Sequence, residues 1–85
     1  MVYDTLTSLS PADVLARAKE FFAERVPASP AFPEKEGPTF LVLRGQGGEE
    51  IALNAHTADE GTKVRASTLF FDQAVDRFLS TLPTV

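Results

Sequence analysis

Residues 39–70 read TFLVLRGQGGEEIALNAHTADEGTKVRASTLF. Two runs rich in β-branched and apolar residues, 39–44 and 49–56, flank the glycine-rich segment GQGG. A second turn at 57–61 leads into a third run, 62–70. Extended runs joined by short turns that contain glycine are typical of antiparallel hairpins. The segment therefore predicts a three-stranded antiparallel meander.

The last two runs alternate between apolar and polar residues, which assigns their side chains to opposite faces of the sheet. One face is predicted to carry Ile51, Leu53, Ala55, Val64, Ala66, Thr68 and Phe70. The other is predicted to carry Asn54, His56, Lys63, Arg65 and Ser67. An antiparallel sheet with this pattern has one face on the core and one partly in water.

Two amphipathic helices are predicted on either side of the meander. Ser10 is a good N-cap, Pro11 suits the first helical position and Asp13 approximates a capping box, so a helix is expected from there to about Arg25. The second helix is expected from Phe71 until Pro83 stops it. Each has an apolar stripe at helical spacing.

The remaining segments are less regular. Residues 26–38 contain several prolines and are predicted to form a long connection from helix to sheet. Residues 1–9 are rich in β-branched side chains, so a short first strand is plausible. The expected fold class is α+β in the order (β)-α-β-β-β-α. One sheet of three or four strands would carry both helices on one face, within a single domain spanning residues 1–85.

Composition limits the classes of function. The 85 residues carry 12 acidic and 8 basic side chains, a formal net charge of −4, and the basic residues are scattered. Nucleic-acid binding is not expected, because phosphate-binding surfaces cluster lysine and arginine. The absence of cysteine excludes thiolate metal sites. No apolar stretch could span a bilayer, so membrane insertion is not expected and a cytoplasmic location is the default.

No catalytic, metal or cofactor site is predicted. His56, the only histidine, lies at the end of a predicted strand beside a turn that contains Asp59 and Glu60. One imidazole with two turn carboxylates falls short of a metal site, and an exposed histidine explains it better. Residues 45–48 precede a strand rather than a helix, so they are interpreted as a hairpin turn and not a phosphate loop. The acidic pairs lie in turns, where solvated charge is the simpler reading.

The run Phe40, Leu41, Val42 and Leu43 is apolar on both faces. If the helices cover one face, something must cover the other: the loop that contains Phe32, another subunit, or a partner protein. The strand is also expected to be a sheet edge, where an apolar surface favours pairing with another chain. These five residues are the predicted interaction site. A second candidate is the polar face, where Arg44, Asn54, His56, Lys63 and Arg65 could recognise an acidic partner or simply be solvated.

The order of elements carries a resemblance. The entry Ser10-Pro11-Ala12-Asp13-Val14 and the segment Gly61-Thr62-Lys63-Val64-Arg65, before the last helix, resemble the START/Bet v 1-like, polyketide-cyclase-like helix-grip superfamily. That resemblance implies a small apolar ligand, such as a lipid or polyketide, held between sheet and helices. The residues that would line its site are Phe21, Phe22, Phe78 and Leu82, which otherwise form core.

The leading hypothesis is a non-enzymatic interaction module, either a homodimer or a small accessory subunit of a larger assembly. The alternative is an apolar-ligand binder of the helix-grip kind.

Overall fold

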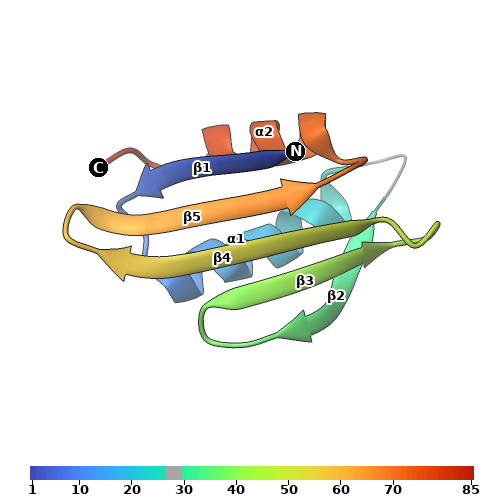
Figure 1. The fold of residues 1–85 in the computed structure, drawn as a ribbon, viewed down its shortest axis with the longest axis horizontal. Helices are drawn as coiled ribbons and strands as arrows, with labels where there is room; N and C mark the ends of the chain where they lie inside the picture. The colour runs from blue at the N-terminus through green and yellow to red at the C-terminus, as the bar shows by residue number, and fades with distance from the viewer. Residues whose placement is uncertain (27–29) are drawn as a thin grey trace.

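The computed structural model describes residues 1–26 and 30–85, which form a five-stranded antiparallel sheet with two helices behind one face (Figure 1). The elements in chain order are β1 (Val2–Thr7), α1 (Pro11–Glu24), β2 (Ala31–Glu36), β3 (Phe40–Gly45), β4 (Glu50–Ala58), β5 (Gly61–Thr68) and α2 (Asp72–Ser80). The strand order in the sheet is β1-β5-β4-β3-β2. The predicted α+β class is confirmed, whereas the prediction of three or four strands was too low.

Strand β1 lies at one edge of the sheet and pairs with β5 along its whole length, from Val2 opposite Ser67 to Thr7 opposite Thr62. The predicted first strand is therefore confirmed. The chain termini lie beside opposite ends of β1 (Figure 1). At the far end, the Thr7 hydroxyl donates to the Pro83 carbonyl over 2.6 Å, so the segment after α2 is fastened to the end of β1.

Strand β2 forms the other edge and was missed, because its residues were predicted to belong to a connection. Only Ala31 of β2 is buried, so the strand shows no alternation of apolar and polar residues. Its register with β3 shifts between Pro33 and Lys35, an irregularity that an edge strand tolerates. The part of the predicted connection at residues 27–29 lies outside the described residues. Because β2 pairs with the outer side of β3 within the sheet, the prediction that the Phe40–Leu43 strand is a sheet edge was wrong.

Both helices begin close to where the sequence predicts. The Ser10 side chain accepts a hydrogen bond of 3.2 Å from the Asp13 amide, which confirms the predicted N-cap of α1. Helix α2 begins differently, because Phe71 at its N-cap position makes no side-chain cap bond. There the Thr68 hydroxyl accepts from the Phe71 amide over 3.1 Å and donates to the Glu50 carbonyl, closing the turn between β5 and α2.

The core lies between the sheet and the two helices. Apolar side chains of β3, β4 and β5 face the buried stripes of α1 and α2; its fully buried large members are Val14, Phe22, Leu41, Leu43, Ile51, Leu53, Val64, Val75 and Phe78. The predicted faces of β4 and β5 are confirmed with one exception. Phe70, predicted to point inward, is 76% exposed, because β5 ends at Thr68 and Phe71 takes the buried position instead.

Candidate functional site

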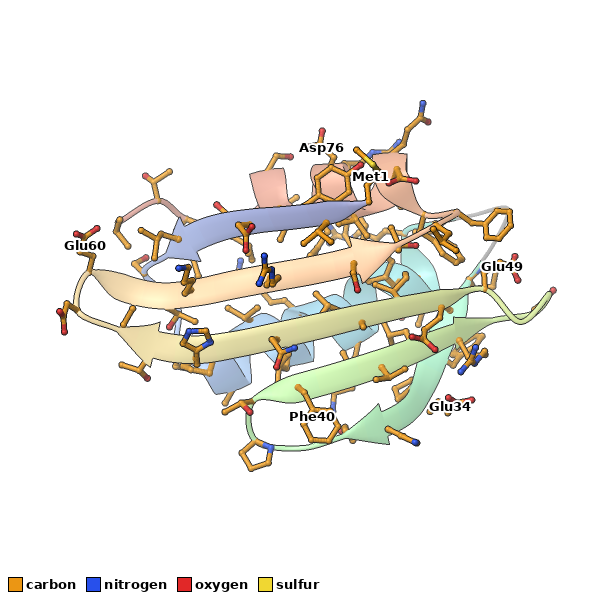
Figure 2. All side chains as sticks on the ribbon, in the orientation of Figure 1. Met1, Glu34, Phe40, Glu49, Glu60 and Asp76 are labelled. Carbon is orange, nitrogen blue, oxygen red and sulfur yellow. The ribbon has the colours of Figure 1, made fainter. Side chains whose placement is uncertain are left out.

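The candidate site is the sheet face opposite the helices, called the outer face below. Figure 2 is drawn in the orientation of Figure 1, with the helices behind the sheet and this face toward the reader. Polar and charged side chains of β4 and β5 lie on it, as predicted for Asn54, His56, Lys63 and Arg65. Strand β3 adds Phe40, Val42 and Arg44. Five strands thus present one continuous surface.

A row of small and apolar side chains crosses the outer face. Val2 of β1 lies opposite Ser67 of β5, Ser67 lies opposite Ala52 of β4, and Ala52 lies opposite Val42 of β3. These four residues are called the cross-sheet row. Directly opposed side chains in an antiparallel sheet are about 5 Å apart, so the row forms a continuous strip. Ser67 and Ala52, in the middle of the row, have short side chains, so the longer side chains on either side project further from the sheet.

An apolar corner continues the row at its β1 end. Met1 and Thr68 hydrogen-bond through their backbones, which brings Leu69 and Phe70 to the same end of the sheet as Val2. Leu69 is 84% exposed, and Met1 and Phe70 are also largely in solvent. A groove of about 460 Å³ lies here, lined by Met1, Val2, Glu50, Ser67, Thr68 and Leu69. Large exposed apolar side chains that gather in one place mark interaction sites more often than single ones do.

Ordered charges border the row on the side of the β3–β4 turn. Arg44 hydrogen-bonds to both carboxylate oxygens of Glu34, at 2.7 and 3.0 Å, and to Glu50 at 3.0 Å. The hydrogen bond from Arg44 lowers the pKa of Glu34, and the same bond raises the pKa of Arg44. A bidentate arginine between two carboxylates has a defined geometry, although such exposed pairs add little to stability. Arg44 is therefore held in place rather than free to bind an anion.

A polar depression of about 340 Å³ borders the row on the side of the β4–β5 turn. It is lined by Asp4, His56, Lys63 and Arg65. The Arg65 Nε lies 3.4 Å from Asp4 Oδ1 across the β1–β5 pair, so Arg65 pairs with a carboxylate of its own chain. His56 is exposed and lies opposite Lys63.

The structure separates the five predicted interaction residues into two groups. Leu41 and Leu43 are fully buried beneath the helices and belong to the core. Phe32 (51% exposed), Phe40 and Val42 face outward. Figure 2 shows Phe40 at the β2–β3 turn, where its ring lies against Gly37. The strand is therefore apolar on both faces, as predicted. The segment containing Phe32 lies beside it in the sheet, not over it.

The residues proposed to line a ligand site lie in the core. Phe21, Phe22, Phe78 and Leu82 are all buried. The ring centroids of Phe21 and Phe22 are 5.1 Å apart, and those of Phe22 and Phe78 are 5.5 Å apart, distances typical of packed aromatic pairs. These rings contact one another in the space that an apolar ligand between the sheet and the helices would occupy.

Two further features limit the chemistry of the described residues. Within residues 1–26 and 30–85, histidine and acidic side chains do not gather in threes as a metal ion would require. The helices in the same residues are too short and too polar to cross a membrane.

No protein-family model matches the sequence, and comparisons with curated proteins and with solved structures found no match. The resemblance to the helix-grip superfamily therefore stays a prediction.

Sequence reasoning missed the apolar corner. Leu69, Phe70 and Phe71 are three large apolar residues in a row, and an extended chain cannot turn all three toward one core. That run was a usable signal that some of them are exposed. The part played by Met1 and Val2 could not be seen, because it depends on the pairing of β1 with β5.

Proposed function

We propose that this protein is a non-enzymatic interaction module, a homo-oligomer or a small accessory subunit of a larger protein assembly, and that it associates through its outer face. The observation that carries the proposal is the cross-sheet row together with the apolar corner. Val2 and Val42 place apolar surface on the outer face, and Leu69 lines the groove beside Val2. Met1 and Phe70 add exposed apolar side chains at the same end of the sheet.

Apolar and charged residues are distributed on the outer face as they are in protein–protein interfaces. Protein interfaces combine an apolar centre, depleted of charge, with a polar rim. Here the cross-sheet row is the apolar centre. Arg44 with its two carboxylates borders it on one side, and Arg65 with Asp4 borders it on the other. Burial of a large apolar side chain contributes about 1.5–3 kcal/mol, so burial of Leu69 and Phe70 would favour association strongly.

The alternative, a binder of small apolar ligands, has less support. Its predicted lining residues pack against one another, and Phe22 and Phe78 are almost completely buried. The groove that Phe21 and Phe78 do line opens between the two helices among Arg17, Glu20 and Arg25. A site bordered by so many charges suits a lipid or polyketide poorly.

Substitution of single outer-face residues tests the proposal. Val42→Asp and Leu69→Asp each place a charge on the outer face without entering the core. We expect both variants to stay folded by circular dichroism and to form smaller assemblies than the unmodified chain at the same concentration, measured by sedimentation velocity of the purified chain and by native mass spectrometry of the complex from its host. Ala16→Asp, on the exposed side of α1, is the matched control and should associate normally.

A further control separates the two faces of β3. Leu41→Asp buries a charge in the core and should unfold the chain, in contrast to Val42→Asp one position along. If Val42→Asp and Leu69→Asp both associate like the unmodified chain, the outer face is not the interface and the proposal is wrong.

A further inference from the structure

The two edges of the sheet are protected to very different degrees. Edge strand β2 contains Pro33, an irregular register and the charged run Glu34, Lys35 and Glu36, all of which discourage pairing with another strand. Edge strand β1 has none of these features. It reads Val-Tyr-Asp-Thr-Leu-Thr, with a single charge at Asp4, and it pairs with β5 in unbroken register. Edge strand β2 is therefore protected against pairing with another strand, whereas edge strand β1 is open to it.

The alternation of the ladder identifies the open backbone groups of β1. Met1 and Thr68 exchange backbone hydrogen bonds, so they form a hydrogen-bonded pair. Such pairs alternate with non-bonded pairs along antiparallel strands. Val2, Asp4 and Leu6 are accordingly in non-bonded pairs, and their N–H and C=O groups point away from β5. Among the described residues, no hydrogen bond engages these groups.

Ser8 shows that an outward backbone group along this edge can hydrogen-bond to another segment. It continues the same alternation, and its N–H donates to the Pro83 carbonyl over 3.3 Å. The segment after α2 therefore closes the edge just beyond β1. The open part is limited to the stretch from Val2 to Leu6, about the length of an ordinary short strand.

We propose that β1 pairs antiparallel with β1 of a second copy, which joins the two sheets into one continuous sheet. This inference goes beyond the proposed function, because it uses a strand edge rather than the outer face and names the partner. A strand that pairs antiparallel with its own copy is related to that copy by a two-fold axis. The open N–H groups of each copy therefore face open C=O groups of the other. The register centred on Asp4 is the one that engages all three open residues of both copies.

Side-chain chemistry agrees with this register. With the axis at Asp4, Val2 of one copy lies opposite Leu6 of the other, so apolar side chains meet on the outer face on both sides of the centre. The two Asp4 carboxylates meet at the centre, but each already has Arg65 of its own chain at 3.4 Å. Two acids and two arginines then alternate across the junction, which offsets the repulsion between like charges. Each bonded residue pair exchanges two backbone hydrogen bonds.

The experiment compares Asp4→Pro with Asp4→Asn in the full chain. Proline removes the outward N–H of residue 4 but no bond to β5, whereas asparagine removes the charge and keeps the N–H. By sedimentation equilibrium, we expect the unmodified chain to dimerise and Asp4→Pro to raise the dimer dissociation constant at least about tenfold, because the bond is lost twice at the axis. Asp4→Asn should change the constant by less than about threefold.

Amide hydrogen exchange of the unmodified chain provides a readout that needs no variant. At low concentration the amides of Val2, Asp4 and Leu6 should exchange rapidly, while those of Tyr3 and Thr5 are protected by β5. At high concentration the first three should become protected as well. A chain that stays monomeric up to about 1 mM, unchanged exchange at the three positions, or an Asp4→Pro variant that dimerises normally would each overturn the inference.

The test is separate from that of the outer face. Val42→Asp should leave the concentration-dependent protection of Val2, Asp4 and Leu6 intact, because Val42 lies on β3, three strands away. If an unrelated extended peptide occupies the edge instead, the three amides will be protected only in its complex and the purified chain will not dimerise, which contradicts pairing with a second copy.

Discussion

Tyr3 links the first strand to the last helix through one hydrogen bond. Its phenol donates to Asp72 Oδ1 over 2.8 Å, and Asp72 is the first residue of α2. This bond raises the pKa of Tyr3 above its ordinary value of 10.0, and partial desolvation and the charges of Asp72 and Asp76 act in the same direction. The bond exists only while the phenol keeps its proton, so it links the packing of α2 on β1 to pH.

The raised pKa of Tyr3 makes a prediction about alkaline stability. A group whose pKa is higher in the folded state contributes stability that is complete below its unfolded pKa and is lost as pH rises through its folded pKa. The free energy of unfolding should therefore fall above about pH 10 in the unmodified chain. Tyr3→Phe should remove this contribution. Tyr3 is the only tyrosine and there is no tryptophan, so its tyrosinate absorbance can be titrated directly.

Asp72→Asn is the control for this titration. It removes the acceptor charge and should bring the pKa of Tyr3 back toward 10.0. A Tyr3 that titrates at the same pH in the unmodified chain and in Asp72→Asn would show that the hydrogen bond does not shift its pKa.

At the scale of elements, the turns depend on two glycines with positive φ angles. Gly48, in the β3–β4 turn, has φ of +92° and open space where a Cβ would lie. Gly61, at the start of β5, has φ of +144°, and an added Cβ would lie 2.7 Å from the Thr7 carbonyl oxygen. The first position excludes side chains through backbone strain alone. The second excludes them also because β1 is so close.

Alanine substitution of the two glycines should give different losses. Gly48→Ala should lower the free energy of unfolding by about 1 kcal/mol, from strain alone. Gly61→Ala should lower it by more, about 2–4 kcal/mol, because the Thr7 backbone must move as well. Urea denaturation monitored by circular dichroism measures both. An equal or larger loss for Gly48→Ala would contradict the close approach of β1 to Gly61.

The elements also differ in how well the sequence predicts them. Helix α1 was predictable from its cap and its apolar stripe, which are both local features. Strand β2 was not, because only Ala31 turns toward the core and Pro33 argues against a strand. An edge strand is held by backbone bonds to one neighbour and need not bury a face. Its existence depends on β3 more than on its own side chains.

At the scale of the whole molecule, an aromatic cluster holds the two helices together. Phe78 of α2 lies 5.4 Å from Phe21 and 5.5 Å from Phe22 of α1 between ring centroids. The helices are far apart in sequence, and these rings lie where they meet over the sheet. A chain of 85 residues has a marginal core, so the loss of one of these rings should affect the whole fold.

Truncation of Phe78 tests that role. Phe78→Ala should lower the free energy of unfolding by about 3–5 kcal/mol, which is comparable with the total stability of a small domain. Phe32→Ala is the matched control, since this half-exposed ring on β2 should cost less than about 1 kcal/mol. Thermal denaturation measures both. Similar losses of unfolding free energy for the two variants would show that the aromatic cluster stabilises the fold no more than a half-exposed ring does.

In the candidate site, as in the fold, some features could be predicted from the sequence and others could not. The polar face of β4 and β5 was predictable from alternation, because a period of two is written in the sequence itself. The outward position of Val42 was only half predictable, since an apolar strand does not reveal which side faces the core. The cross-sheet row needs the register of four strands at once, and no local pattern encodes that register.

The sequence by itself determined the helices, the N-cap of α1, the meander from β3 to β5 and the α+β class, because these follow from periodicity, capping and turn chemistry over a few neighbouring residues. The tertiary structure alone decided the place of β1 beside β5, the strand nature of β2 and the exposure of Leu69 and Phe70. These features depend on contacts between distant segments, such as the bond that joins Met1 to Thr68 across 67 positions. The open edge and the apolar corner arise there, where distant segments meet.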